Sequence, residues 1–252
     1  GPGLLSCLMI GVSTAKALSL LNDNELMPIN HLEGHIASCF IENVVDFPAI
    51  CLVVSGGHTS IYYLEDEINF KEISSTIDDA AGEAFDKGAK MLGLGYPGGI
   101  RIDEVSKNAN KEFHTFPIPE LKNSLNFSFS GLKTSLRYYL EKRGDWEKDI
   151  NDIASSYQEA IVKSLIAKIK KASLDYKPKS ILFCGGVACN SRLREVAQSE
   201  LTKFKTIFPS KIFCTDNGAM IAMRGIQKKS VSKKKSPLNF PVFSTIRKFK
   251  KD

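Results

Sequence analysis

The spacing of apolar and polar residues predicts helices and then strands in the first third of the chain. Small and apolar residues dominate 3–21, and a second helical pattern spans 30–43. Residues 49–66, AICLVVSGGHTSIYYLED, are two apolar runs around a Gly-Gly pair, which is typical of a β-hairpin. A third strand is expected at 69–77, NFKEISSTI. This part therefore predicts two helices followed by a meander of about three strands.

Helices alternate with single strands in the rest of the chain. A helix is expected at 78–94, opened by two aspartates and stopped by GYPGG at 95–99. The further expected segments are a helix within 127–143, a long helix at about 150–175, a strand, Gly-Gly turn and helix at 179–201, a strand near 206–208, and a turn and helix at 212–227. A strand meander followed by this alternation is the pattern of a ribonuclease-H-like α/β lobe.

Composition narrows the class of protein. The 252 residues suffice for one large domain or two smaller lobes. No apolar run approaches the roughly 20 residues of a membrane-spanning helix, and no basic region precedes the apolar N-terminal segment, so neither a membrane anchor nor a secretory signal is expected. The six cysteines include no C-x-x-C pair and lie in apolar stretches, which favours reduced, buried thiols over a zinc ribbon or a disulfide scaffold.

The net charge of +6 is concentrated at the end of the chain. Residues 227–252 carry nine lysines and arginines against one aspartate, so the remainder is slightly acidic. Such a segment is either a solvated, partly disordered end or a basic arm that contacts nucleic acid phosphates. Charge alone does not separate these two interpretations.

Two Gly-Gly turns follow apolar strands, SGGHT at 55–59 and CGGVACN at 184–190. In α/β sheets such turns bring backbone N–H groups to a position where phosphate or ribose can approach. The alternative is that both are ordinary tight turns. Because there are two of them, each after an apolar strand, we interpret them as two walls of a nucleotide site.

His31 and His35 lie four residues apart in INHLEGHIASCF, residues 29–40, so a helix places both imidazoles on one face. This is not the H-E-x-x-H motif of metalloproteases, because Leu32 follows the first histidine. Asp216 in CTDNGAM lies where a strand meets a helix and is the candidate third ligand. Such an open site suits iron(II) or zinc. The alternative is two polar residues that share a solvent-facing helix side.

Six motifs in this order resemble the TsaD family, also known as Gcp or O-sialoglycoprotein endopeptidase, in its bacterial and mitochondrial branch. They are NHLEGH, VSGGHT, IDDAAGEAFDKGAKMLGLGYPGG, FSFSGLKTS, CGGVACNSRLR and CTDNGAMIA. The resemblance runs from Gly1 to about Gly225. It implies the actin/sugar-kinase fold, in which two ribonuclease-H-like lobes enclose a nucleotide cleft. It also implies transfer of a threonylcarbamoyl group from threonylcarbamoyl-AMP to N6 of the tRNA adenosine 3′ of the anticodon, with release of AMP.

The resemblance also implies roles for individual residues, which match the family's motifs by position. The implied metal ligands are His31, His35 and Asp216. They would hold one divalent ion, with iron(II) as the first choice and zinc(II) as the alternative. The implied substrate-binding residues are Val54, Ser55, Gly56, Gly57, His58, Asp86, Gly99, Asp103 and Asn190. His58 is the candidate general base by location alone, and the alternative is that it has a structural role or orients the ligand. The sequence assigns no catalytic residue beyond it.

The implied partners are tRNA, threonylcarbamoyl-AMP, and either accessory proteins of the TsaB and TsaE type or a second copy of the chain. The implied location is the cytoplasm of a bacterium, or the mitochondrion of a eukaryote. A kinase of the same fold needs an N-terminal Asp-x-Gly phosphate loop, which this sequence does not contain. A zinc protease needs a general-base glutamate that is not in place here.

Family members begin with a strand that carries a GIETSCDDT-like motif, ahead of the Gly-Pro-Gly segment at which this sequence begins. We therefore expect an incomplete first lobe, with 1–30 as its remnant, 31–226 as the second lobe bearing the metal and nucleotide site, and 227–252 as a basic tail. Helix 3–21 would then lack its packing partner, which favours aggregation or an obligate partner. The alternative function is a non-catalytic family relative that binds nucleotide and metal and acts as an interaction protein.

Overall fold

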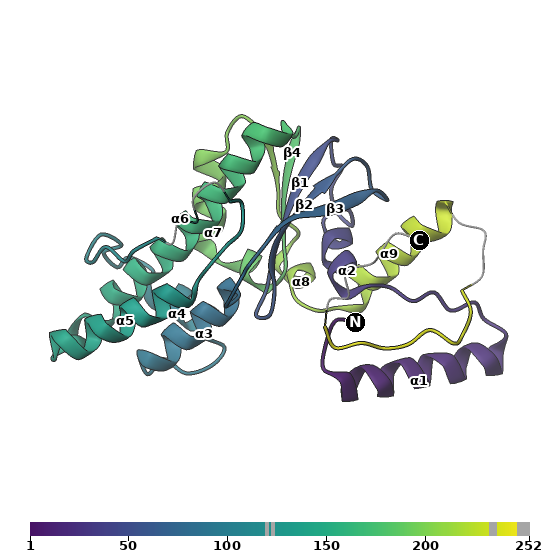
Figure 1. The fold of residues 1–252 in the computed structure, drawn as a ribbon, viewed down its shortest axis with the longest axis horizontal. Helices are drawn as coiled ribbons and strands as arrows, with labels where there is room; N and C mark the ends of the chain where they lie inside the picture. Colours follow the sequence, from purple (N-terminus) through teal and green to yellow (C-terminus); the bar gives the residue numbers. More distant parts are fainter. Residues whose placement is uncertain (119–120, 122–123, 232–235, 246–252) are drawn as a thin grey trace.

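The computed structural model describes residues 1–118, 121, 124–231 and 236–245. Its centre is one mixed sheet with the strand order β3-β2-β1-β4-β5 (Figure 1). The strands are β1 (Ala49–Val54), β2 (Thr59–Leu64), β3 (Phe70–Ser75), β4 (Ser180–Cys184) and β5 (Lys205–Ile207). The first three form an antiparallel meander, and β4 and β5 add parallel to β1. The expected hairpin, third strand and ribonuclease-H-like order are confirmed.

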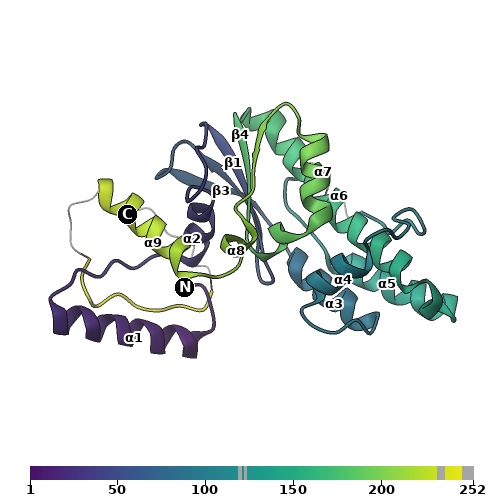
Figure 2. The ribbon, with the colours of Figure 1, turned by 180° about the vertical axis from the view of Figure 1, so that it is seen from behind.

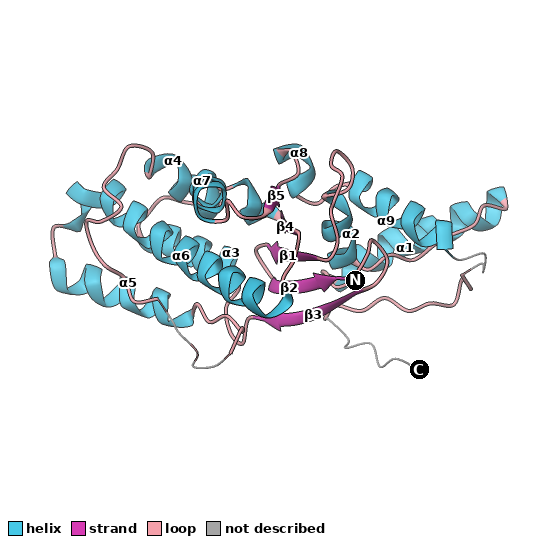
Figure 3. Ribbon diagram, turned by 90° about the horizontal axis from the view of Figure 1, so that it is seen from above, coloured by secondary structure: helices cyan, strands magenta, loops and turns pink. Residues whose placement is uncertain are grey.

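Helices cover both faces of this sheet (Figure 3). They are α1 (Leu5–Asn22), α2 (His31–Ser38), α3 (Ala81–Met91), α4 (Gly98–Val105), α5 (Ser130–Arg143), α6 (Ile150–Tyr176), α7 (Ser191–Glu200), α8 (Lys211–Cys214) and α9 (Gly218–Val231). Two 3₁₀ turns, Trp146–Asp149 and Gly186–Cys189, precede α6 and α7. The long helix expected at about 150–175 is confirmed.

Side chains alternate between the two faces of the central strand β1. Ile50, Leu52 and Val54 face a large core with α3, α5, α6 and α7, whereas Cys51 and Val53 face a smaller core with α2. All six residues of β1 are buried. A strand with both faces covered needs apolar residues throughout, which explains why AICLVV lacks the polar alternation of a surface strand.

The start of α3 differs from the expectation. Asp78 and Asp79 do not open this helix, which begins at Ala81, whose N–H donates to Thr59 Oγ1 at 2.8 Å. The Asp78 carboxylate instead accepts bonds from the N–H of Phe129, at 2.7 Å, and from the hydroxyl of Ser130, at 2.8 Å. Asp78 therefore serves a long-range contact with the start of α5, whereas Asp79 pairs with Lys87 of α3 at 2.6 Å. Neither aspartate opens α3, so that part of the expectation is wrong.

Two further boundaries differ from the sequence expectation. The helix expected over 30–43 ends at Ser38. The GYPGG segment was expected to stop a helix, but α3 ends before it, and Gly98 within it begins α4. Proline immediately before the first helical residue suits this start, because its φ is fixed and it has no N–H to leave unpaired.

Helix α1 lies apart from both cores and has no buried residue. Leu20 and Leu21 are 69% and 82% exposed. By length and composition alone α1 could cross a membrane, in contrast to the expectation from the sequence, although soluble proteins contain helices that meet the same test. The C-terminal segment 236–245 runs beside it (Figure 1), and Lys16 Nζ donates to the carbonyl oxygen of Phe240 at 3.0 Å. A cavity of about 720 Å³ lies between α1 and this segment.

The basic end of the chain is partly described. Helix α9 continues to Val231, and Lys229 pairs with Glu25 at 2.5 Å. Residues 232–235 and 246–252, which carry most of the positive charge, lie outside the described residues. The division into lobes and tail stays a prediction. All six cysteines are free thiols, as expected, although Cys7 is exposed.

Candidate metal and nucleotide site

His31 and His35 lie on α2, and Asp216 lies in the turn between α8 and α9, not at the expected junction of a strand and a helix. The side chain of Asn30 caps α2 by accepting from the N–H groups of Leu32 and Glu33 at 2.9 and 3.3 Å. Asp216 Oδ1 lies 3.4 Å from His31 Nε2 and 3.2 Å from His35 Nε2. The three residues that the sequence analysis proposed as ligands are therefore brought together from positions up to 185 residues apart in the chain.

These distances fit a shared ion. Two ligands at the corners of a tetrahedron with metal bonds of 2.0–2.1 Å lie about 3.3 Å apart. Together the three donor atoms lie within 4.8 Å of one another. Three protein ligands leave coordination positions open, which is the arrangement of catalytic rather than structural sites. His35 is 1% exposed, whereas the side chain of Asp216 is 75% exposed, so the open side faces solvent at Asp216.

The environment of His35 favours its neutral, metal-binding form. Burial, together with the charge of His31, lowers the pKa of His35 to about 4, although Asp216 acts in the opposite direction. A neutral imidazole has a lone pair available for a metal ion. The other ring nitrogen, Nδ1, is buried and has no hydrogen-bond partner among the described residues.

A second group of potential ligands lies inside the smaller core. The thiol sulfurs of Cys39, Cys51 and Cys184 lie within 4.8 Å of one another, and all three residues are completely buried. Their neighbours are apolar residues of α2, β1 and β4. This group is part of the packing between α2 and the sheet.

The two Gly-Gly turns meet at one edge of the sheet, because β1 and β4 are parallel neighbours and both turns follow them. Gly185 has φ +91°, and a Cβ there would collide with the carbonyl oxygen of Val54. Gly82, in the first turn of α3, lies close to the turn that follows β1, since its Cβ would be 2.5 Å from the carbonyl oxygen of Ser55. Val54, Ser55, Gly56 and Gly57 are thus held between α3 and the turn after β4.

His58 closes the first of these turns. Its carbonyl oxygen accepts from the N–H of Ser55 at 2.8 Å, and its own N–H donates to Ser55 Oγ at 3.2 Å. The side chain is half-buried, and burial, together with the nearby charge of His31, lowers the pKa of His58. The turn therefore places a histidine that is neutral at pH 7 next to the His31, His35 and Asp216 group.

Asp86, Gly99 and Asp103 lie on α3 and α4. Asp86 Oδ1 accepts from the N–H of Gly98 at 2.7 Å, which joins the two helices. Asp103 Oδ1 accepts from the hydroxyl of Ser191 at 2.7 Å, which joins α4 to the start of α7. A cavity of about 490 Å³ opens beside Asp86, and one of about 310 Å³ opens beside Asp103 and Ser191.

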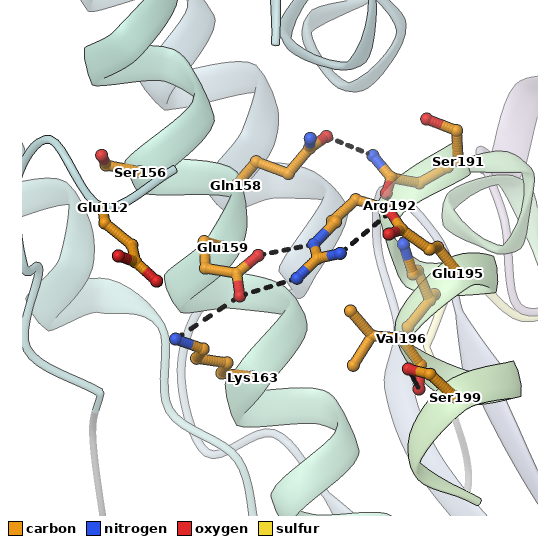
Figure 4. A network of polar contacts seen from close by, with 12 residues as sticks. Glu112, Ser156, Gln158, Glu159, Lys163, Ser191, Arg192, Glu195, Val196 and Ser199 are labelled. Atoms are coloured by element: carbon orange, nitrogen blue, oxygen red, sulfur yellow. Dashed lines mark hydrogen bonds and ion pairs between the residues drawn. The ribbon is translucent and has the colours of Figure 1, made fainter. Parts of the chain in front are cut away.

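Asn190 is almost completely buried and caps α7. Its Oδ1 accepts from the N–H of Leu193 at 2.9 Å, and its Nδ2 donates to Gln158 Oε1 at 2.6 Å. The next residue of α6, Glu159, binds Arg192 through two hydrogen bonds of 2.7 and 3.1 Å (Figure 4). A polar seam between α6 and α7 therefore fixes the segment that carries Asn190.

Sequence reasoning missed several of these partners. Gln158 and Glu159 lie within a long helix whose apolar period explains its pattern completely, so nothing local distinguishes them. Arg224 is also missed, although it is 3% exposed and its Nε lies 2.9 Å from Glu33 Oε2. A buried arginine within α9 has no local signature, because its partner is 191 residues away in the chain.

Comparisons with known proteins identify the family of the chain. A family profile described as "TsaD: tRNA N6-adenosine threonylcarbamoyltransferase" matches residues 1–223. The protein of that name from Thermodesulfovibrio yellowstonii is 47% identical over 237 residues, which are 90% of this chain and 71% of the relative. The one from Syntrophus aciditrophicus is 47% identical over 230 residues, 89% of this chain and 68% of the relative.

Solved structures resemble the fold at low sequence identity. HypF from T. kodakarensis superposes with a TM-score of 0.67 at 14% identity, over 86% of this chain and 39% of that one. The dehydratase component A from Acidaminococcus fermentans gives 0.52 at 17% identity, over 81% and 70%. These likenesses confirm the mixed α/β fold of the actin/sugar-kinase class. Together with the family profile and the bacterial relatives, they establish that the chain belongs to the TsaD family of tRNA N6-adenosine threonylcarbamoyltransferases, which carry out the t6A modification of tRNA.

Proposed function

We propose that this chain uses His31, His35 and Asp216 to hold one divalent ion, iron(II) or alternatively zinc(II), beside a threonylcarbamoyl-AMP site. The observation that carries the proposal is the convergence of three donor atoms from α2 and the α8–α9 turn, with Asp216 Oδ1 at 3.2 and 3.4 Å from the two imidazoles. Such an ion would act as a Lewis acid toward an oxygen of the bound substrate.

The Val54–His58 turn would hold the acyl-adenylate. Gly56 and Gly57 are exposed, and an added Cβ at either would meet nothing within 4 Å, so there is room for a ligand to approach their backbone. Asp86, Gly99 and Asp103 would hold the nucleoside, because carboxylates accept hydrogen bonds from ribose hydroxyls. Asn190 would form the wall behind them, since its side chain already binds Gln158 and Leu193.

The mixed anhydride is an activated donor, so the chain's main tasks are to position the donor and the tRNA adenine and to stabilise developing charge. The adenine N6 attacks the carbamoyl carbon, the bond from that carbon to the phosphate oxygen breaks, and AMP leaves while N6 loses a proton. His58 is our candidate acceptor of that proton, because its lowered pKa leaves the imidazole neutral at pH 7. The basic C-terminal segment would contribute to the binding of tRNA phosphates.

The test is formation of threonylcarbamoyladenosine in unmodified tRNA, measured by mass spectrometry of nucleosides. The purified chain is loaded with iron(II) and supplied with threonylcarbamoyl-AMP, with and without accessory proteins of the TsaB and TsaE type. His35→Ala and Asp216→Ala are expected to lower the rate at least tenfold, and His114→Ala, which removes a histidine stacked on Tyr139 away from the site, serves as the matched control.

Two outcomes would count against parts of the proposal. Unchanged rates in both His35→Ala and Asp216→Ala would remove the metal role. No product with the wild-type chain under any of these conditions would instead favour the non-catalytic interaction protein. The reaction without accessory proteins, together with sedimentation of the chain, separates two cases. Product formed by a sedimenting dimer would mean that a second copy suffices, whereas product formed only with the accessory proteins would mean that they are required.

A further inference from the structure

We propose that a contact between α2 and α9, made by Gly34 with Ile221 and by Glu33 with Arg224, sets the position of Asp216 relative to the two histidines. We call these four residues the α2–α9 clamp. They are positioning residues, because none of them reaches the donor atoms. The proposal rests on the proposed metal centre and adds to it the residues that determine its geometry.

The two halves of the metal site are fixed by different parts of the fold. Helix α2 lies on the sheet, where Leu32, Ile36 and Cys39 pack into the smaller core. The positions of the histidines therefore follow from that core. Asp216 has no such support, because its side chain is 75% exposed. It lies two residues before α9, so its place depends on where α9 begins.

Helix α9 lies directly beside α2 (Figure 2), and Gly34 of α2 faces it. A Cβ on Gly34 would lie 2.8 Å from Ile221 Cδ1 and 3.4 Å from Met220 Cγ. Gly34 lies between the two histidines in the chain. The absence of a side chain at this position thus leaves room for Ile221 and Met220 of α9 against α2, on the helix that follows Asp216.

Arg224 holds the same helix from the other side of this contact. Its Nε donates to Glu33 Oε2 at 2.9 Å, and its Nη1 and Nη2 donate to the carbonyl oxygens of Glu67 and Ile68 at 2.7 and 3.3 Å. The guanidinium also lies 4.6 Å from the centre of the Phe70 ring. One buried side chain therefore ties α9 both to α2 and to the turn between β2 and β3.

This arrangement exploits the geometry of arginine. A planar guanidinium can donate to three acceptors in fixed directions. A lysine ammonium, on a side chain that reaches less far, cannot reproduce these bonds. Glu33 also pairs with Lys228 Nζ at 2.7 Å, but Lys228 is partly exposed and has this single ion pair among the described residues. Arg224 is thus expected to carry the positioning, and Lys228 provides an internal comparison on the same carboxylate.

The position of a ligand matters because metal sites tolerate only small displacements. The ligand atoms of a functional site are held to within about 0.5 Å of their working positions. Loss of the groups that orient these ligands typically weakens metal binding 10–100-fold. An added methyl group at Gly34 meets the ends of the Ile221 and Met220 side chains first, and whatever part of the overlap these side chains do not absorb by turning moves α9, and Asp216 with it. The clamp is therefore expected to act on metal affinity and coordination geometry.

The test is a titration of the purified full chain with cobalt(II) chloride, followed by the visible absorption of the bound ion. Gly34→Ala is expected to raise the dissociation constant for cobalt about tenfold and to change the shape of the absorption bands. Ile221→Val removes the Cδ1 atom that the new methyl group would meet, so the double variant is expected to recover wild-type affinity and bands. Gly225→Ala, at a position on α9 where an added Cβ meets nothing within 4 Å, is the matched control.

A second set of variants tests the polar half of the clamp. Arg224→Lys and Glu33→Gln are expected to weaken cobalt binding about tenfold, whereas Lys228→Ala leaves it within twofold. Each variant is checked by circular dichroism, and if Gly34→Ala does not fold, Glu33→Gln carries the test because it preserves shape at a residue whose side chain is 21% exposed.

Failure of the clamp and failure of the metal centre give different results. Folded Gly34→Ala and Arg224→Lys proteins with the wild-type dissociation constant and spectrum would overturn the clamp. The proposed metal centre itself fails if His35→Ala binds cobalt as tightly as the wild type. A weakened Gly34→Ala that Ile221→Val does not rescue would also overturn the positional explanation.

Discussion

Gln158 accepts a 2.6 Å hydrogen bond from Nδ2 of Asn190, and both side chains are almost completely buried. The bond joins the middle of α6 to the residue that caps α7. A position that the family resemblance assigns to substrate binding therefore also has a structural task. Substitutions there act on stability as well as on binding, and the two effects have to be measured separately.

Asn190→Ala removes both the cap and the partner of Gln158. Loss of an N-cap costs about 1 kcal/mol, and an unsatisfied buried amide costs about 1–3 kcal/mol. We expect the free energy of unfolding in urea to fall by about 2–4 kcal/mol. Asn190→Ser keeps a capping oxygen and is expected to lose less. Equal urea midpoints for wild type and Asn190→Ala would contradict the structural role of this residue.

The Glu159–Arg192 pair predicts a stability that depends on pH. Burial acts to raise the pKa of the Glu159 carboxyl, but hydrogen bonds and charge from Arg192, with help from Lys163, lower this pKa below its usual value of 4.5. A carboxyl with a lowered pKa in the folded state stabilises the fold above its unfolded pKa, and this contribution is lost as the pH falls through the folded pKa.

Glu159→Gln is therefore expected to lower the free energy of unfolding by about 2 kcal/mol at pH 7 and by progressively less below about pH 4.5. Urea unfolding of both proteins at a series of pH values measures the difference. The exposed pair of Lys148 and Asp145 is the control, since Asp145→Asn should change stability by less than about 0.5 kcal/mol. A difference for Glu159→Gln that does not vary with pH would contradict an ionised, paired Glu159.

Asp78 supports the start of α5 from a loop near α3. Its carboxylate accepts bonds from the hydroxyls of Ser128 and Ser130, at 2.5 and 2.8 Å, and from the N–H of Phe129, at 2.7 Å. Asp78→Ala is expected to lower the free energy of unfolding by about 1–2 kcal/mol. Hydrogen exchange at the first residues of α5 should accelerate in this variant, and unchanged exchange there would show that α5 begins without the carboxylate.

The sequence predicted the features that are local and periodic. AICLVV and SILFC lie in the sheet as expected, because continuous apolar runs of this length fit strands covered on both faces. The spacing of His31 and His35 predicted a shared helix face, and the structure places Asp216 within 3.4 Å of both. Asp216 was chosen from its expected place in CTDNGAM, and the family resemblance contributed the substrate-binding positions.

Features that depend on contacts between distant segments were not predicted. Asp78 and Asp79 have the right residue type for the start of a helix, yet Asp78 binds the first residue of α5, 52 residues later. Gly34 reads as an ordinary residue of HLEGH until α9 is placed beside it. Propensity describes a residue's preference for its own element, whereas these residues are determined by a second element whose position follows only from the assembled core.

Two helical glycines give a last prediction about packing. A Cβ on Gly88 of α3 would collide with the ring of Tyr157, which is buried on α6 and donates its hydroxyl to the carbonyl oxygen of Ala84 at 3.0 Å. A Cβ on Gly131 of α5 would meet nothing within 4 Å. In an open helical position, alanine is more favourable than glycine because it has less conformational freedom to lose on folding.

Gly88→Ala is therefore expected to lower the free energy of unfolding by about 1–3 kcal/mol, because an added methyl group in a close-packed core forces its neighbours apart. Gly131→Ala is expected to raise it by about 0.4–1 kcal/mol. The same substitution thus changes sign between two helices of one protein, and urea unfolding of both variants measures it. If Gly131→Ala destabilises the protein as much as Gly88→Ala does, the contact between α3 and α6 is not the reason that a glycine is required at position 88.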